Sequence, residues 1–205
     1  MTQEARAGDL LDNNARERAR AELEFAHCRF HALLDSLSEA EWAAPSRNPA
    51  WTNGQLVYHI LFAFILVPSL FWMIKFWSRL PTRYSRGFAQ VLNFTTPVFN
   101  RINALGPRGQ AFVFGRKRAG AIFDRIHRSI LKKVDSLHGG HWSDGMHYPR
   151  RWDPTFGDFM TFEDLFKYPP AHFEHHLGQL SAGSVSRCSS DSDPHYIRGE
   201  SVDMV

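Results

Sequence analysis

The sequence predicts an all-α protein, a bundle of four main helices with short extra helices between the second and the third. Apolar residues recur three and four positions apart in several long stretches, and two expected helix starts carry capping-box signals. No stretch shows the alternation of apolar and polar residues that marks a half-buried strand. The 205 residues can bury one substantial core, so a single folded domain is expected.

The first two helices are expected in the N-terminal part of the chain. Apolar residues at helical spacing place the first helix over about residues 15–37, and residues 1–14 before it are expected to be flexible. The second helix has a clear start signal, because Thr52 and Gln55 have the spacing of a capping box. It continues through an apolar block in which Pro68 is expected to kink or end its first half.

The other two helices are expected further along the chain. Prolines and glycines are expected to break residues 80–115 into short helices and loops. A long helix is predicted over residues 116–137, and residues 139–158 are expected to form a loop. The last helix begins near Thr161, and Pro169-Pro170 either kinks it or starts a new helix.

The domain limits and the expected cell compartment follow from composition. The bundle is expected over residues 15–182, followed by a disordered polar tail over 183–205. A net charge of +3 does not argue for nucleic acid, and the basic run 116–118 is typical of a solvated helix start. No nucleic-acid partner is therefore expected. Two cysteines, Cys28 and Cys188, are too few for a disulfide framework, so a reducing cytoplasm is expected.

The apolar block raises the question of a membrane. No charged residue occurs between Asn48 and Ile74, and a bilayer span needs about 20 apolar residues. His59, Pro68 and Ser69 are unfavourable in lipid, so a buried helix of the bundle is the favoured interpretation. The aromatic segment 62–77 could instead form a dimer face or a surface for weak membrane association. Basic residues follow it, as at a membrane surface: Lys75, Arg79, Arg83 and Arg86.

Three histidines are the best candidates for chemistry. His172 and His176 are four residues apart on the last helix, so both imidazoles can reach one metal ion. His59 is the only histidine in the uncharged second helix, and a polar ring buried there needs a partner. Packing the second helix against the last would bring the three together. Three neutral imidazoles with an open fourth position are typical of a catalytic divalent-metal site.

Simpler interpretations remain open on spacing alone. A histidine on an apolar helix face is often only a hydrogen-bonded core residue. A second pair with the same spacing, His27 and His31, lies on the first helix beside Cys28. Spacing does not rank this pair above or below His172 and His176.

Two segments of the chain resemble the DinB/YfiT-like superfamily. The segment Trp51–His59 resembles the start of the family's second helix, where a Trp and a small hydroxyl residue precede a ligand histidine. The segment His172–Gln179 resembles the signature of its fourth helix, two histidines four apart followed by Gln. The end of the first helix, 33–38, also fits the family's opening, and the resemblance covers roughly residues 15–182.

The resemblance implies a four-helix bundle in up-down-down-up order, with a divalent metal held by three histidines. These match His59, His172 and His176 here. Members include bacterial S-transferases that use mycothiol, bacillithiol or glutathione, mycothiol-dependent isomerases and metal hydrolases. The resemblance does not extend to His27 or His31, for which a core or surface role is expected. The aromatic segment 62–77 and the basic loop after it depart from the family pattern.

The expected function is therefore that of a divalent-metal-dependent S-transferase or hydrolase. Zinc is the favoured ion, with nickel or another divalent ion as the alternative, and a low-molecular-weight thiol is the expected cosubstrate of a small molecule. No catalytic residue is assigned beyond the metal ligands. Gln179 or His175 is expected to orient a ligand imidazole, and Tyr168 to face the open position. A homodimer in the cytoplasm, or at the membrane periphery, is expected. The alternative is a non-catalytic bundle that serves as an interaction or membrane-surface module.

Overall fold

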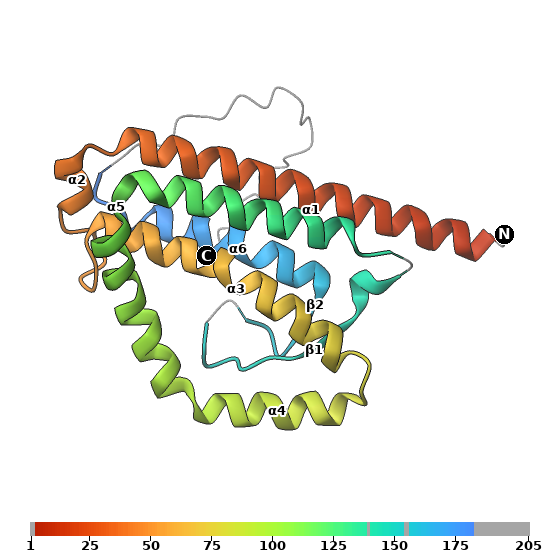
Figure 1. Cartoon of the computed structure of the whole chain (residues 1–205). Helices are drawn as coiled ribbons and strands as arrows, with labels where there is room; N and C mark the ends of the chain where they lie inside the picture. Colours follow the sequence, from red (N-terminus) through yellow and green to blue (C-terminus); the bar gives the residue numbers. More distant parts are fainter. Residues whose placement is uncertain (1–2, 139, 154–155, 183–205) are drawn as a thin grey trace, which may run out of the picture.

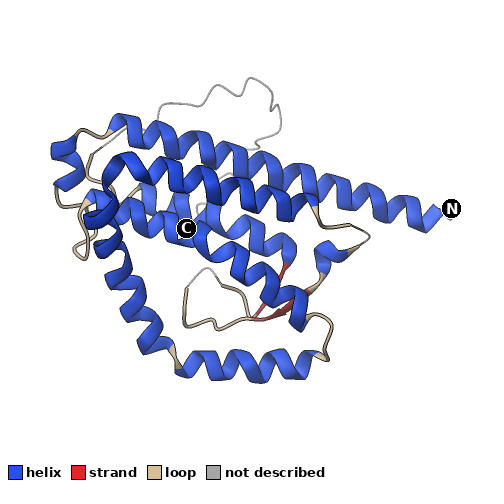
Figure 2. Ribbon diagram, viewed as in Figure 1, coloured by secondary structure: helices blue, strands red, loops and turns tan. Residues whose placement is uncertain are grey.

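Helices form most of the protein in the computed structural model, which describes residues 3–138, 140–153 and 156–182, with side chains from residue 12 onward (Figures 1 and 2). The expected tail over 183–205 lies outside the described residues. In chain order the elements are α1 (Gln3–Ser36), α2 (Glu39–Ala43), α3 (Asn53–Trp77), α4 (Thr82–Phe94), α5 (Thr96–Asp135), the 3-10 helix η1 (His141–Ser143), β1 (Gly145–His147), β2 (Phe159–Thr161) and α6 (Phe162–Leu177).

Four long helical segments pack side by side: α1, α3, the second half of α5, and α6 (Figure 1). Each contributes a fully buried phenylalanine to the centre of the bundle. The Phe123 ring of α5 lies 4.3 Å from that of Phe30 and 4.7 Å from that of Phe64, and Phe30 lies 6.2 Å from Phe173 of α6. Such rings remove large apolar areas from water and contact at favourable tilted angles, so they hold the four segments together. The expected helical bundle is confirmed at this level.

The helices differ from the expected ones at two places. Helix α1 begins at Gln3, well before the expected start at residue 15. Residues 82–114 form α4 and the first half of α5 instead of short helices and loops. This part of the chain forms an arm that lies apart from the four packed segments (Figure 1). We call α4 and the first half of α5 the arm.

Helix α5 bends sharply at Gly115, where the arm joins the bundle. Gly115 has φ 61° and ψ −178°, a backbone conformation that is essentially restricted to glycine. The Tyr58 hydroxyl of α3 donates a hydrogen bond of 2.9 Å to the Gly115 carbonyl. The next residue, Arg116, donates to the carbonyls of Leu34 and Leu37 at the end of α1. These bonds fix the bend against both helices.

Two short strands correct the expectation of a protein without strands. β1 and β2 pair antiparallel, with Met146 opposite Met160 in the centre of the register. Each strand has three residues, which is too short for an alternating pattern to be visible in the sequence. Both strands lie in the segment between α5 and α6 that was expected to be a loop. β2 ends at Thr161, directly before α6.

Hydrogen bonds join the start of α3 to the residues that follow α6, and so bring His59 and His176 close together. Asn53 is fully buried, and its side-chain amide donates to the Glu41 carbonyl and to the Ser181 hydroxyl. Ser181 returns a backbone N–H to the Asn53 side chain. A buried amide with all these partners fixes its neighbours firmly, since leaving any of them unpaired is costly. His59 and His176 therefore face each other near this junction.

The apolar helix α3 lies in the core. By length and composition it is the one helix among the described residues that could cross a membrane, but 61% of its most apolar window is buried inside the bundle. Core helices of soluble proteins pass the same test. Two large aromatic side chains of α3 face outward instead: Trp72 and Phe76 are each 59% exposed. Pro68 does not end the helix, which continues to Trp77.

Candidate metal centre

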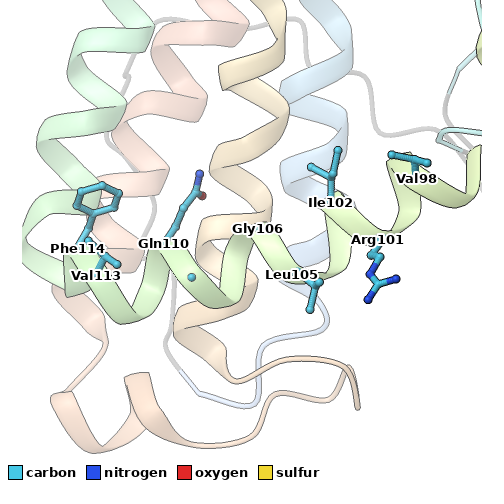
Figure 3. A pocket seen from close by; sticks show the side chains of 9 residues that line it. Val98, Arg101, Ile102, Leu105, Gly106, Gln110, Val113 and Phe114 are labelled. Carbon is cyan, nitrogen blue, oxygen red and sulfur yellow. The ribbon is translucent and has the colours of Figure 1, made fainter. Parts of the chain in front are cut away.

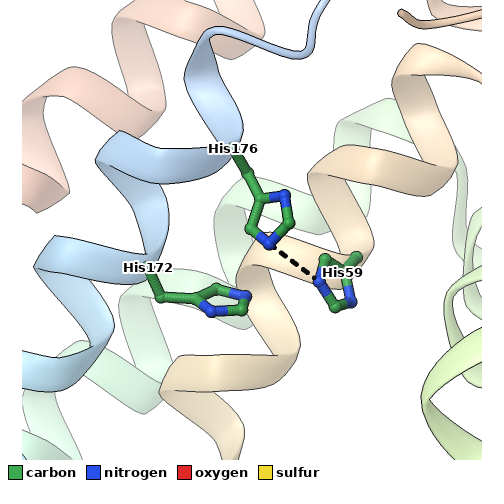
Figure 4. A group of neighbouring side chains, drawn as sticks. All are labelled: His59, His172 and His176. Carbon is green, nitrogen blue, oxygen red and sulfur yellow. Dashed lines mark hydrogen bonds between the residues drawn. The ribbon is translucent and has the colours of Figure 1, made fainter. Parts of the chain in front are cut away.

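Three imidazoles meet between α3 and α6 (Figure 4). His59 comes from α3, and His172 and His176 come from successive turns of α6; all three are buried. The ring centres lie 4.4 to 5.0 Å apart, and the Nε2 atoms of His59 and His176 are 3.1 Å apart. One nitrogen of each ring lies within 4.8 Å of the others, close enough for a single metal ion.

The capping boxes of the two helices position these rings. The Thr52 side chain accepts the backbone N–H of Gln55, and the Gln55 side chain accepts that of Thr52, which fixes the start of α3. Thr161 and Asp164 do the same for α6. Pro169 and Pro170 lie inside a single continuous α6, so they do not start a new helix. Residues four apart on it share a face, as expected.

Burial keeps the imidazoles of His59 and His176 neutral. Burial, together with the neighbouring His172 and His176, lowers the pKa of His59 to about 3, while Asp153 acts in the opposite direction. Burial lowers the pKa of His176 to about 4, again with a contribution from His172. A neutral imidazole has a free lone pair, which is the form that binds a metal ion.

A divalent metal fits the environment of His172. Its Nδ1 lies 3.4 Å from the Asp153 carboxylate, and both side chains are largely buried. Its Nε2 is also buried and has no hydrogen-bond partner among the described residues. A buried nitrogen of this kind is costly unless something binds to it. A carboxylate behind the opposite ring nitrogen is the usual arrangement around metal-bound histidines.

Gln179 orients His176 in a similar way. Its side-chain oxygen lies 3.1 Å from His176 Nδ1 and also accepts a hydrogen bond of 2.9 Å from the Asn48 amide. The Gln179 carbonyl accepts the backbone N–H of Arg47 at 2.8 Å. Because Nδ1 of His176 faces this acceptor, Nε2 is left for the cluster. His175 is exposed and lies outside the cluster, with its Nε2 3.4 Å from the Gln179 amide nitrogen.

Tyr168 is near the cluster but is directed to Asp153. Its hydroxyl lies 3.1 Å from the Asp153 carboxylate, and its ring centre lies 5.5 Å from that of His172. Burial, and then the Asp153 charge, raise the pKa of the Tyr168 hydroxyl well above its usual value, so it stays a donor. Tyr168 therefore contacts His172 through its ring and through Asp153.

Two residues at the cluster received no role from the sequence. Asp153 lies far from His172 in the chain, in an irregular segment without a motif. Trp51 was visible only as part of the family motif. In the structure its ring stacks on His59, with centres 4.4 Å apart, and its Nε1 donates to the Ala104 carbonyl of the arm at 3.3 Å. Trp51 thus covers His59 and connects it to the arm.

The fold and the cluster together define a helical-bundle protein with a candidate centre for one divalent ion. The family model of the DinB superfamily matches residues 22–180, and the chain belongs to this superfamily. The expected membership of the DinB/YfiT-like superfamily is thereby confirmed. A search found no match among curated proteins and none among solved structures.

Proposed function

We propose that the protein is a divalent-metal-dependent enzyme that transfers a low-molecular-weight thiol to a small molecule, or hydrolyses such a molecule. The observation that carries the proposal is the buried cluster of His59, His172 and His176, in which Nε2 of His172 has no hydrogen-bond partner among the described residues. Zinc suits three neutral imidazoles, and nickel and cobalt have similar preferences.

Each side chain around the cluster has a definable task. A bound divalent ion lowers the pKa of a coordinated thiol or water, which supplies a nucleophile near neutral pH. His59, His172 and His176 would hold the ion, and Asp153 and Gln179 keep two of these rings in the required orientation. Trp51 stacks on His59 and covers one face of its ring. Three protein ligands leave a position for the thiol or water.

The first experiment measures metal content. Wild type, His59→Ala, His172→Ala and His176→Ala are purified identically and analysed by plasma mass spectrometry. Each of the three substitutions is expected to remove one divalent ion per chain relative to wild type. The matched control is His175→Ala on the same helix, which is expected to keep the wild-type content. Equal metal content in all five proteins would contradict the proposal.

The second experiment measures the reaction. The metal-loaded protein is incubated with glutathione or another low-molecular-weight thiol and an electrophilic aryl halide, and in parallel with an activated ester and no thiol. Thiol consumption supports the transferase, and ester cleavage alone supports the hydrolase. Either activity is expected to be lost in His172→Ala and kept in His175→Ala. Activity that persists in His172→Ala would overturn the assignment to this site.

A second candidate function is binding to an anionic membrane surface through the arm. Phe94 and Phe112 are 85% and 92% exposed, which is unusual for aromatic residues. A groove of about 670 Å³ lies along the first half of α5, and its wall is apolar apart from Arg101 and Gln110 (Figure 3). The chain contains no Asp or Glu between Trp42 and Phe123. An apolar surface with only basic charges is typical of interfacial membrane segments.

Vesicle sedimentation tests this second candidate. The protein is expected to sediment with vesicles rich in phosphatidylserine and to stay in solution with neutral vesicles. Phe94→Ser/Phe112→Ser is expected to reduce sedimentation, since both rings are exposed and their loss leaves the core intact. A protein that never sediments would contradict membrane binding. A dimer detected by light scattering, and lost in the same variant, would instead assign this surface to a second copy of the chain.

A further inference from the structure

A second group of imidazoles and carboxylates lies between α1 and the second half of α5. His27 and His31 project from successive turns of α1, and Asp124 faces them from α5. The Asp124 Oδ1 atom lies 2.8 Å from His27 Nε2 and 2.7 Å from His31 Nε2. None of these residues belongs to the three-histidine cluster between α3 and α6.

The backbone of α5 allows this close approach. Gly120 lies opposite His31, where a Cβ atom would come within 3.1 Å of the His31 ring. Its absence lets the ring lie directly against α5. Asp124 is one helical turn beyond Gly120, so it presents its carboxylate on the same face. The His27 and His31 ring centres are consequently 4.7 Å apart, with the carboxylate shared between them.

A third imidazole and a second carboxylate lie beside this trio. The His127 ring stacks on His27 with centres 4.3 Å apart. Its Nε2 is buried, has no hydrogen-bond partner among the described residues, and lies 3.6 Å from the Glu24 carboxylate. Burial lowers the pKa of His127, and the neighbouring His27 lowers it further, so this ring also keeps a free lone pair.

The trio has the chemistry of a transition-metal site. Partial burial alone would raise the pKa of Asp124, but the hydrogen bonds from His27 and His31 outweigh it and hold that pKa below its usual value. The carboxylate is therefore charged at neutral pH. All three side chains are 29–43% exposed, so an ion can reach them from solution. Metal–nitrogen bonds of about 2.1 Å place neighbouring ligand atoms about 3 Å apart, close to the separations present here.

We propose that His27, His31 and Asp124 form a second binding site for a divalent transition-metal ion such as zinc, nickel or cobalt. Two histidines and one carboxylate on one side of an ion leave its other positions open to water or a small ligand. His127 and Glu24 form a separate, neighbouring group with His27. The site goes beyond the proposed enzyme function, because it uses different helices and does not require the first centre to be occupied.

The test isolates this site in a protein that lacks the first one. His59→Ala/His172→Ala serves as the background, and its binding of Co²⁺ is followed by calorimetry and by visible absorption. The background is expected to bind one ion per chain at micromolar concentration, with a d–d absorption band. Adding His31→Gln or Asp124→Asn is expected to weaken binding by roughly tenfold or more.

The matched control is His141→Gln in the same background. His141 also pairs with a carboxylate, Asp144 at 2.7 Å, but without a second histidine. Its substitution is expected to leave the affinity and the absorption band unchanged. Failure of the background protein to bind Co²⁺ would overturn the proposal, as would binding that survives both His31→Gln and Asp124→Asn. Either result concerns this site alone, because the first centre is absent from every protein compared.

Discussion

Within the three-histidine cluster, the direction of each ring nitrogen matters as much as the presence of the ring. Gln179 faces Nδ1 of His176, and Asp153 faces Nδ1 of His172. In both cases Nε2 is the atom left for an ion. A ring turned the other way would place a protonated nitrogen at the centre and would not bind.

Removing these orienting contacts is expected to weaken metal binding without unfolding the protein. Asp153→Asn and Gln179→Leu should each lower the affinity for zinc by roughly 10–100-fold, since contacts of this kind typically contribute that much. The affinity is measured by competition with a chromogenic chelator. His175→Ala is the control, with an expected affinity near that of wild type. Unchanged affinity in both Asp153→Asn and Gln179→Leu would show that neither contact orients a ligand.

The buried histidines also predict how the metal-free protein responds to acid. The pKa of His59 is about 3 in the fold against 6.5 when unperturbed, so between these values the unfolded chain binds more protons. Stability is therefore expected to fall as the pH drops below about 6.5, by about 2 kcal/mol at pH 5 from His59 alone. Urea unfolding of the chelator-treated protein at several pH values measures this loss. His59→Gln should show a smaller dependence on pH; an identical dependence would mean that His59 does not titrate on unfolding.

Single residues were predictable from the sequence only where spacing or a motif marked them. His172 and His176 share a helix face, and His59 is the one histidine of an apolar helix, so all three could be named in advance. Asp153 could not, because its contact with His172 depends on how the segment between α5 and α6 folds back. The relation of His27 and His31 to Asp124 was likewise invisible, since it depends on the packing of α1 against α5.

Among the elements, the bend in α5 places the arm. Gly115 adopts a backbone conformation that side chains disfavour, and hydrogen bonds from neighbouring residues hold it. The arm is connected to the candidate metal centre through the hydrogen bond from Trp51 Nε1 to the Ala104 carbonyl. The bend therefore decides how the arm meets the candidate metal centre.

Substitution of this glycine is expected to destabilise the protein. Gly115→Ala should lower the free energy of unfolding by about 1–3 kcal/mol, because alanine is strained at this φ and ψ. Gly109→Ala is the matched control in the same helix, where a Cβ would meet nothing within 4 Å and alanine favours the helix. Urea unfolding compares the two variants. A Gly109→Ala loss as large as that of Gly115→Ala would argue against strain at the bend.

Element boundaries were predicted well where a cap exists and poorly elsewhere. The starts of α3 and α6 agree with the capping boxes at Thr52 and Thr161. The start of α1 does not, because its first residues are mostly polar. The prolines of the arm predict breaks between short helices, but α5 contains two of them. Pro97 lies in its first turn, where the missing N–H is harmless, and Pro107 lies within the helix.

At the scale of the whole molecule, the three-histidine centre joins parts of the chain that are distant in sequence. His59 lies on α3, and His172 and His176 lie on α6 near the end of the described residues. An ion that binds only the folded form stabilises it by mass action.

Metal removal is therefore expected to lower the melting temperature. An ion at 100 times its dissociation constant contributes about 2.7 kcal/mol, which corresponds to several degrees for a protein of this size. Calorimetry with and without chelator measures the shift. His172→Ala should melt at nearly the same temperature in both conditions, and a shift as large as that of wild type in this variant would place the stabilising ion elsewhere.

The bundle itself was predictable because its helices carry strong apolar periodicity, and the four central phenylalanines follow it. The arm was not, because its exposed apolar residues have no core to face and resemble those of a broken, irregular region. Patterns of burial identify a core efficiently, but they give no information about a helix whose apolar residues are exposed.

The capping boxes of α3 and α6 have a final consequence for how the chain can change length. Each helix is capped by a threonine, so each candidate metal ligand is a set number of residues from its cap, and each residue turns a helix by about 100°. One residue added between Thr52 and His59 would rotate the His59 imidazole out of the cluster, even though no existing residue is changed. The turn between α3 and α4 does not lie between a capping threonine and a histidine of the cluster, so its length does not change their spacing. Insertions are therefore expected to be tolerated only where they leave the orientation of the three imidazoles unchanged.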